Sequence, residues 1–288
     1  NTTGSKQTAL GSQALVAATT GVENTAVGFG ALASVTTASN NTAVGSNALV
    51  QSTASNNTAV GHDALLLNTS GTLNVAVGAL SLDANTTATE NTAVGYASLT
   101  ANTTGGFNTA VGTASLLVNT TGGANTSIGV DALKNNTTAS NNVAVGRSAL
   151  LSNTTGTRNT AVGSSALDAN TTADRNTAVG FNTLTTNTTG SYNTCIGDAA
   201  LEANTNGHNN VAIGQAALVL NTTASNNTAV GTFALDSNTT GGNNTAVGVN
   251  SLGQNTTASD NTAIGTGALG LNQTGSEDTC VGRSAGLN

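Results

Sequence analysis

The sequence contains no proline, tryptophan or methionine, and it has few charged or aromatic residues. Only 7% of its 288 residues are charged, and its aromatics are four phenylalanines and two tyrosines. A globular domain of ordinary composition carries about 25% charged residues. Because large side chains are so scarce, one compact core is excluded. The sequence instead predicts a thin core of small aliphatic side chains extended along an axis.

Charge and hydropathy exclude several partners. The net charge is −7, and the six basic residues are scattered, so no basic stripe exists for nucleic acid. No apolar run approaches the roughly 18 residues of a membrane-spanning helix, so we expect no membrane insertion. The chain has no initiator methionine and no signal peptide. We therefore expect it to be processed or to be an excerpt of a longer protein.

The sequence consists instead of one motif written seventeen times. The motif is Asn-Thr-Ala-Val-Gly in most copies, and its glycines recur every 17 residues, apart from one interval of 16 between Gly45 and Gly61. We number repeat positions from the motif's Asn (position 1), so that Gly is position 5. A fixed short period is typical of repeats that stack as successive coils. It predicts an all-β fold, a parallel β-solenoid or β-roll of seventeen coils, as one continuous array over residues 1–288 without a separate globular domain.

Two repeat positions are aliphatic almost throughout. Position 4 is Val or Ile in all repeats but the first, and position 9 is Leu in all but the last. We expect a strand over positions 1–5, a weaker strand over 8–11 and a corner over 12–15. Strand alternation puts positions 2 and 4 on one face, which we predict to be the inner face. The predicted core columns include Val27, Leu32, Val94, Leu99, Val145, Leu150, Val230 and Leu235.

Position 3 accepts only Ala, Ser or Cys. A column kept this small is expected to pack against a second layer or a neighbouring chain. Ala144, Cys195 and Cys280 are therefore candidate contacts between chains. The two cysteines lie five repeats apart, which is beyond disulfide reach within one stack. Either each stands in for a buried alanine, or equivalent cysteines of different chains meet around an axis.

Asparagine dominates positions 1 and 12. In a stack of parallel coils such columns become ladders, in which each side-chain amide bonds the one above and the one below. The predicted ladder residues include Asn91, Asn102, Asn108, Asn119, Asn142 and Asn153. The alternative is glycosylation, because Asn85-Thr86-Thr87 and its equivalents match the acceptor pattern.

Positions 6, 7, 10, 11, 16 and 17 vary freely and carry all the aromatic residues. Variable loops on an invariant stack are where repeat proteins bind their partners. The candidate contact residues are Phe29, Tyr96, Phe107, Phe181, Tyr192 and Phe233. His62 and His208 are more than eight repeats apart, and no catalytic or metal-spaced cluster exists. We therefore expect no enzyme activity, no catalytic residues, no cofactor and no metal.

The repeat resembles two related groups of surface proteins. Asn210-Val211-Ala212-Ile213-Gly214 is similar to the head repeat of trimeric autotransporter adhesins, which builds a left-handed parallel β-roll. Residues 91–105 resemble the arrays of phage tail fibres and related bacterial surface proteins, often followed by an endosialidase-type intramolecular chaperone. The resemblance implies a non-catalytic structural or adhesive fibre, three chains side by side, on a cell surface or virion, with a cell-surface glycan or protein as receptor. The period of 17 is longer than is usual in adhesin heads, and neither chaperone nor anchor is present.

Two other functions fit the pattern. Asn1 falls at position 12 and Asn288 at position 11, so the ends are in phase. Either the array is cut from a longer one, or subunits stack head to tail as an extracellular filament. Electron microscopy would distinguish discrete rods from open filaments. The threonine columns at positions 13 and 14 suggest an ice- or surface-binding solenoid. Adjacent strand residues point to opposite sides, however, which spoils a flat array.

Overall fold

Each repeat forms one strand of three residues, at repeat positions 2–4, in the computed structural model of the chain. The structure describes residues 3–287, and within that range it contains strands and turns but no helix. No helix suited to crossing a membrane is therefore found there. The chain divides into two compact units, Asn1–Asn142 and Val143–Asn288, and each is described by itself.

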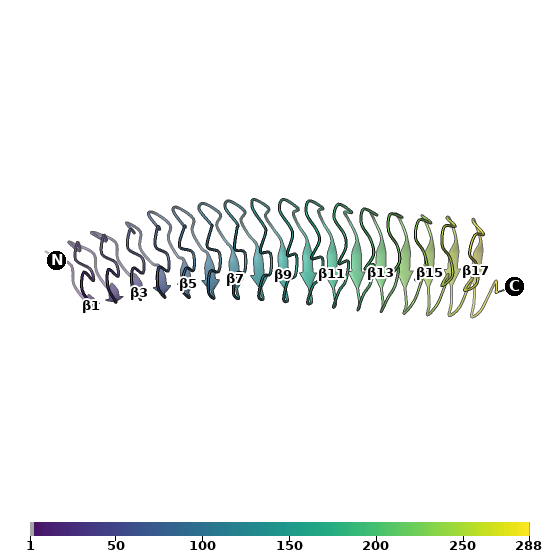
Figure 1. The fold of residues 1–288 in the computed structure, drawn as a ribbon, viewed down its shortest axis with the longest axis horizontal. Helices are drawn as coiled ribbons and strands as arrows, with labels where there is room; N and C mark the ends of the chain where they lie inside the picture. The colour runs from purple at the N-terminus through teal and green to yellow at the C-terminus, as the bar shows by residue number, and fades with distance from the viewer. Residues whose placement is uncertain (1–2, 288) are drawn as a thin grey trace. The chain divides into compact units, whose positions relative to one another are not determined.

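The first unit is a stack of eight parallel strands. They are β1 (Thr8–Leu10), β2 (Thr25–Val27), β3 (Thr42–Val44), β4 (Thr58–Val60), β5 (Val75–Val77), β6 (Thr92–Val94), β7 (Thr109–Val111) and β8 (Thr126–Ile128). Each strand pairs with the next without any shift in repeat position, so that Thr92 of β6 lies opposite Thr109 of β7. Figure 1 shows the arrows side by side, each joined to the next by one coil of chain.

The second unit repeats this arrangement. Its strands are β9 (Val143–Val145), β10 (Thr160–Val162), β11 (Thr177–Val179), β12 (Thr194–Ile196), β13 (Val211–Ile213), β14 (Thr228–Val230), β15 (Thr245–Val247), β16 (Thr262–Ile264) and β17 (Thr279–Val281). Both units are parallel β-solenoids with one coil per repeat, which confirms the predicted fold class. The division between them falls inside a motif, after Asn142, where the sequence pattern does not change. One continuous array therefore stays a prediction.

The inner face of the strand is the opposite of the one predicted. Ala144 at position 3 has no exposed surface, whereas its neighbour Val145 at position 4 is half-buried and points outward. The same correction applies to Val27, Val94 and Val230. The physical reason is the thinness of the coil. The leucine of position 9 fills the interior opposite the strand, and only a side chain as small as alanine fits beneath it.

The leucine column at position 9 is the hydrophobic core, as predicted. Leu32, Leu99, Leu150 and Leu235 are fully buried. The predicted second strand over positions 8–11 is wrong, because these residues form a turn in which the leucine is left-handed, with φ of 56° at Leu99. That conformation costs an L-residue roughly 1–2 kcal/mol. Burying the leucine side chain contributes about 1.5–3 kcal/mol, so the turn holds.

The glycine of position 5 is required by the close approach of successive coils. Gly112 has φ of +131°, and a Cβ atom on it would lie 2.5 Å from the carbonyl oxygen of Gly129 in the next coil. Within each unit, the glycine at position 5 of one coil meets the backbone of the next coil in the same way. Any larger residue would force the coils apart, which explains why this position never varies.

The asparagines of position 12 form the predicted amide ladder. Nδ2 of Asn119 donates to Oδ1 of Asn102 at 2.9 Å, and Nδ2 of Asn136 donates to Oδ1 of Asn119 at 2.9 Å. In the second unit, Asn170 donates to Asn153 at 2.8 Å. All of these residues are fully buried, so an amide without a neighbour in the stack would be left unsatisfied.

The ladder at position 1 has the predicted bond between side-chain amides in some repeats, as from Nδ2 of Asn125 to Oδ1 of Asn108 at 3.1 Å, but its regular donor is a main-chain N–H. The main-chain N–H of Asn108 donates to Oδ1 of Asn91 at 2.9 Å, and that of Asn142 donates to Oδ1 of Asn125 at 3.0 Å. The amide nitrogen of Asn91 instead crosses the coil to the carbonyl oxygen of Gly105, at 3.0 Å. The column thus joins successive coils through its oxygen and closes its own coil through its nitrogen.

The short repeat keeps both core and register. Leu49 and Leu65 are fully buried on either side of it, and the main-chain N–H of Leu49 reaches the next coil at 3.0 Å. Strands β3 and β4 stay paired in register. Ser52 occupies position 12 and Thr53 position 13, after which Ala54 fills the buried position 15. The missing residue is position 14, so the loss falls in the corner.

Candidate binding surfaces

The outer face of each sheet carries two regular columns and no charge. Position 2 is Thr or Val in every strand, and position 4 is Val or Ile in every strand after β1. At position 4, Leu10 of β1 and Val281 of β17 are 66% and 68% exposed, and Ile128, Ile196 and Ile264 are 40–42% exposed. The outer face is therefore an uncharged, β-branched surface, and sequence reasoning missed it because it placed these residues inside.

The residues predicted to contact other chains lie within the coil. Ala144 and Cys195 are fully buried in the interior of their own coils. Burial raises the pKa of the Cys195 thiol well above its ordinary range. Cys280 is a half-buried free thiol on the last strand. The assignment of position 3 to a chain interface was wrong, while a cysteine standing in for a buried alanine is confirmed at Cys195.

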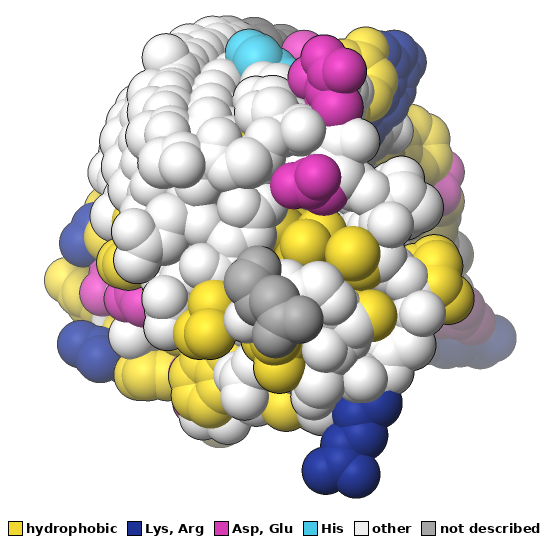
Figure 2. Space-filling model, turned by 90° about the vertical axis from the view of Figure 1, so that its right-hand side faces the viewer, with side chains coloured by type: hydrophobic (Ala, Val, Ile, Leu, Met, Phe, Trp, Pro, Cys, Tyr) yellow, Lys and Arg dark blue, Asp and Glu magenta, His cyan; other side chains and the backbone are white. Residues whose placement is uncertain are grey.

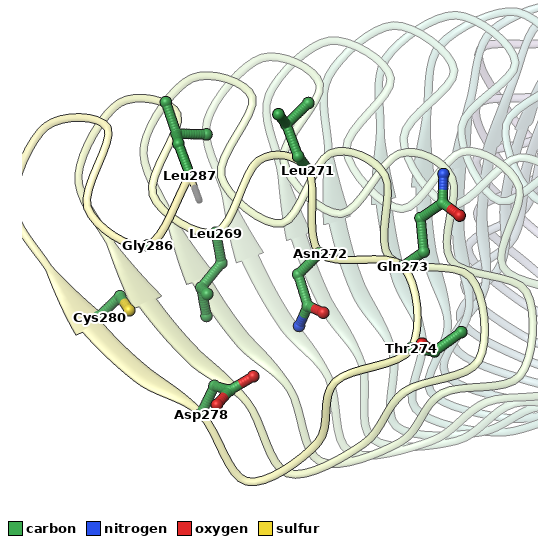
Figure 3. Close-up of a pocket in the computed structure, with 9 residues that line it drawn as sticks. All are labelled: Leu269, Leu271, Asn272, Gln273, Thr274, Asp278, Cys280, Gly286 and Leu287. Carbon is green, nitrogen blue, oxygen red and sulfur yellow. The ribbon is translucent and has the colours of Figure 1, made fainter.

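A cavity of about 600 Å³ opens in the last coils of the second unit. Figure 3 shows its lining, which includes Leu269, Asn272 and Cys280 from the interior columns. Gly286 stands where the other repeats have leucine, so the core side chain of this coil is missing. The larger cysteine takes part of that space, since its sulfur lies 2.6 Å from where a Cβ of residue 286 would be. The cavity is therefore an unfilled coil interior.

The six aromatic side chains are exposed, as their variable positions indicate. Their exposed fractions run from 40% at Phe233 to 62% at Phe107, with Phe29, Tyr96, Phe181 and Tyr192 between. Positions 6 and 17 flank the strand, so five of these rings border the outer face. Their role in binding stays a prediction.

The two threonine columns of the corner, at positions 13 and 14, differ in the surroundings of their hydroxyl groups. At position 13 they bond the next coil, as when Oγ1 of Thr103 donates to the carbonyl oxygen of Thr120 at 3.1 Å. The threonines of position 14, such as Thr104, are exposed. The hydroxyl groups of position 13 are therefore engaged with the next coil, which weakens the argument for an ice-binding array there.

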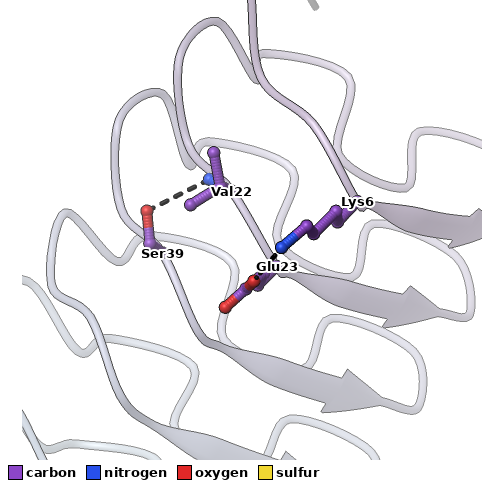
Figure 4. A network of polar contacts seen from close by, with 4 residues as sticks. All are labelled: Lys6, Val22, Glu23 and Ser39. Carbon is purple, nitrogen blue, oxygen red and sulfur yellow. Dashed lines mark hydrogen bonds and ion pairs between the residues drawn. The ribbon is translucent and has the colours of Figure 1, made fainter.

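Side chains at position 16 accept hydrogen bonds from the coil before. Figure 4 shows the main-chain N–H of Val22 donating to Oγ of Ser39 at 3.1 Å, beside an ion pair of 2.9 Å between Lys6 and Glu23 at position 17. The exposed edge is thus held by two parallel columns of contacts.

The same position 16 column continues in the second unit with acidic and imidazole acceptors. The main-chain N–H of Thr157 donates to Oδ1 of Asp174 at 2.6 Å, and that of Asp174 donates to Oγ of Ser191 at 3.1 Å. Ser191 in turn donates to Nδ1 of His208 at 2.9 Å. An acceptor Nδ1 places the imidazole proton on Nε2.

The basic residues are scattered along the chain, but three of them fall within two successive repeats of the second unit. Three of the six basic residues are Arg147, Arg158 and Arg175, and the last two occupy position 17 of successive repeats. The Arg175 guanidinium lies 5.2 Å from the ring centroid of Tyr192 and donates to its hydroxyl. None of the ion pairs formed among residues 3–287 involves these arginines. Figure 2 looks onto the end of the chain that carries the C-terminus. Charged side chains are few in this view, and they are separated by uncharged surface that is mostly drawn in white.

Three aspartates at position 10 are half-buried. Burial raises the pKa of Asp83, Asp168 and Asp236 above the ordinary value of 3.8, against main-chain hydrogen bonds that lower it. They lie in different coils and do not form a cluster. Within residues 3–287, no group of three or more His, Cys, Asp or Glu side chains is placed to hold a metal ion.

Comparisons with known proteins add no family. No protein-family model matches the chain. No curated protein matches it either. Fold and surfaces are therefore what define this protein: a parallel β-solenoid with an invariant interior and a variable, weakly charged exterior.

Proposed function

We propose that this chain is a structural and adhesive element of an extracellular fibre, the shaft or head of a phage tail fibre or bacterial surface adhesin, and that three copies associate through their outer sheet faces. The observation that supports this most is the uncharged column of Val and Ile at position 4. Half-exposed β-branched residues repeated in every coil give a long apolar strip that a second copy can cover.

The interior supports a role as a scaffold. The interior of the coils is already filled by buried columns: asparagine at positions 1 and 12, small residues, mostly alanine, serine or glycine, at positions 3, 8 and 15, and leucine at position 9. Recognition is thus left to the variable outer positions, and self-association to the outer face. A solenoid gains stability by adding coils, which suits a fibre.

Measurement of mass in solution tests the proposal. We expect sedimentation to give three chains for the unaltered protein. Val145→Glu, Val162→Glu and Val179→Glu together would place carboxylates in that interface and should give single chains with an unchanged β-sheet spectrum. The matched control adds the same charge at position 7, with Ser148→Glu, Ser165→Glu and Asn182→Glu, and should keep the mass of three chains.

A single-chain mass for the unaltered protein at high concentration would contradict association through this face. Electron microscopy of the same samples distinguishes the alternative of a head-to-tail filament. Discrete particles of uniform length support the fibre element, whereas open-ended filaments of variable length favour the filament.

A further inference from the structure

We propose that Arg158, Arg175 and Tyr192 bind the carboxylate groups of an acidic polysaccharide. The inference rests on the proposed adhesive function and names its ligand class. The three side chains occupy position 17 of successive coils, in strands paired without offset, so they form one exposed column with a spacing of about 4.8 Å.

The positive charge of this column is uncompensated. Like charges that lie opposite one another in neighbouring coils repel. The chain has a net charge of −7, so it contains more than enough acidic residues to pair with these arginines. The nearest acid in sequence, Asp174, uses Oδ1 to bind the main-chain N–H and the hydroxyl of Thr157, at 2.6 and 2.9 Å. Neither arginine takes part in an ion pair, so both guanidinium groups present donors to a ligand.

The backbone of the column has one repeated conformation, and the Arg175 guanidinium is oriented before any ligand arrives. All three residues adopt the left-handed conformation, with φ of 58° at Arg158, 57° at Arg175 and 62° at Tyr192. Stacking against Tyr192 orients the Arg175 guanidinium, and the tyrosine ring keeps 51% of its surface exposed. Ser191, beside Tyr192, is fixed by its hydrogen bond to His208. A preformed site loses less entropy on binding.

This chemistry fits a chain of carboxylated sugars. A guanidinium binds a carboxylate through two parallel N–H···O bonds, which gives both strength and direction. An exposed aromatic ring packs against the apolar face of a sugar while its hydroxyl meets polar groups. A polymer with a carboxylate on successive sugars can engage both arginines at once. Only two guanidinium groups are too few for the many phosphate contacts on which nucleic-acid affinity depends.

Binding of the purified full chain to oligogalacturonate tests the inference. The comparison ligands are neutral galactose oligomers, sulfated dextran, a poly-glutamate peptide and a single-stranded oligonucleotide. We expect oligogalacturonate to bind, and the variant Arg158→Gln with Arg175→Gln to bind at least about tenfold more weakly. Arg158→Lys with Arg175→Lys keeps the charge but loses the bidentate contact, and should fall between the two.

The matched control removes two positive charges elsewhere, with Lys6→Gln and Lys134→Gln, and should bind like the unaltered protein. A melting curve for each variant shows that it is folded. Equal loss in the control, equal binding of neutral sugar, or no binding at millimolar sugar would overturn the inference. Preference for sulfated dextran, poly-glutamate or the oligonucleotide would overturn it in favour of that ligand. If the unaltered protein fails to bind sugar but has the mass of three chains, the proposed fibre still stands, so the two failures are distinguishable.

Discussion

The side-chain amides of Asn91 and Asn102, at positions 1 and 12 of one repeat, converge on a single carbonyl oxygen. Nδ2 of each donates to the carbonyl of Gly105, at 3.0 and 2.9 Å respectively. The two asparagines thereby close the corner of the coil from opposite sides, while their oxygens accept from the next coil. Each asparagine column therefore has two tasks, to shape one coil and to join it to its neighbour.

Removal of one ladder amide should be costly. Asn119→Ala deletes the donor to Asn102 and to Gly122, and the acceptor for Asn136. A buried partner left unsatisfied costs about 1–3 kcal/mol, so we expect a clear fall in the free energy of unfolding by chemical denaturation. Asn135→Ala, on the exposed surface next to Asn136, is the control and should change little. Equal effects would show that the ladder adds nothing to stability.

Position 3 should tolerate no carboxylate. Ala144→Glu would bury an unpaired charge inside the coil, which costs several kcal/mol. We therefore expect this variant to have a lower melting temperature, measured by circular dichroism, whatever its oligomeric state. The side chain of residue 145 points outward, so Val145→Glu should leave the melting temperature of the single chain nearly unchanged. Ser148→Glu should be silent, since acids already occur at position 7. A reversed order for the first two variants would contradict the assignment of inner and outer faces.

The corner should accept a second short coil. The short repeat that begins at Asn41 lacks position 14 and has Ser52 at position 12 in place of asparagine. The hydroxyl of Ser52 accepts a hydrogen bond from the main-chain N–H of Ala54 at 3.1 Å. We expect deletion of Thr121 together with Asn119→Ser to give a folded protein, because the change copies this arrangement. The expected loss is on the order of the hydrogen bonds removed, about 1 kcal/mol each. Deletion of Val111 instead moves a strand out of register and should unfold its neighbours, as proteolysis would show.

The half-buried aspartates predict a pH dependence. Burial raises the pKa of Asp83, Asp168 and Asp236 in the folded chain. The folded state therefore holds these protons more tightly than the unfolded state, and stability decreases as the pH rises from the ordinary value of 3.8 through the raised values. Replacing all three with asparagine should raise the melting temperature at pH 7 and have much less effect at pH 3. An equal gain at both pH values would mean that charge burial is not the cause.

Much of the fold follows from the period alone. A 17-residue repeat that ends its strand at an unvarying glycine and returns to the same asparagine predicts parallel strands in register and stacked amides. The amide at Asn119 and the leucine at Leu99 lie where the sequence puts them. The sequence also indicates that the residue missing from the short repeat lies in the corner, because the core positions on both sides are intact.

The inner face of the strand could also have been inferred from the sequence. A buried amide at position 1, such as Asn142, requires by alternation that position 3, Ala144, point inward with it, and that Val145 point outward. Hydrophobicity suggested the reverse, since valine is a better core residue than alanine in a wide interior. The signal that decides is the restricted size of position 3, which reports how little room the coil has.

The sequence by itself determined the repeat, a strand within positions 1–5, the leucine core and the asparagine columns, because a strict period makes every coil solve the same packing problem. Only the tertiary structure decided which face of the strand is free, and that positions 8–11 turn through a left-handed leucine instead of forming a strand. It also decided that Asp174 is already engaged beside two arginines that have no ion-pair partner. These features depend on distances between successive coils and across the width of one coil, and no pattern of residue types along the chain encodes those distances.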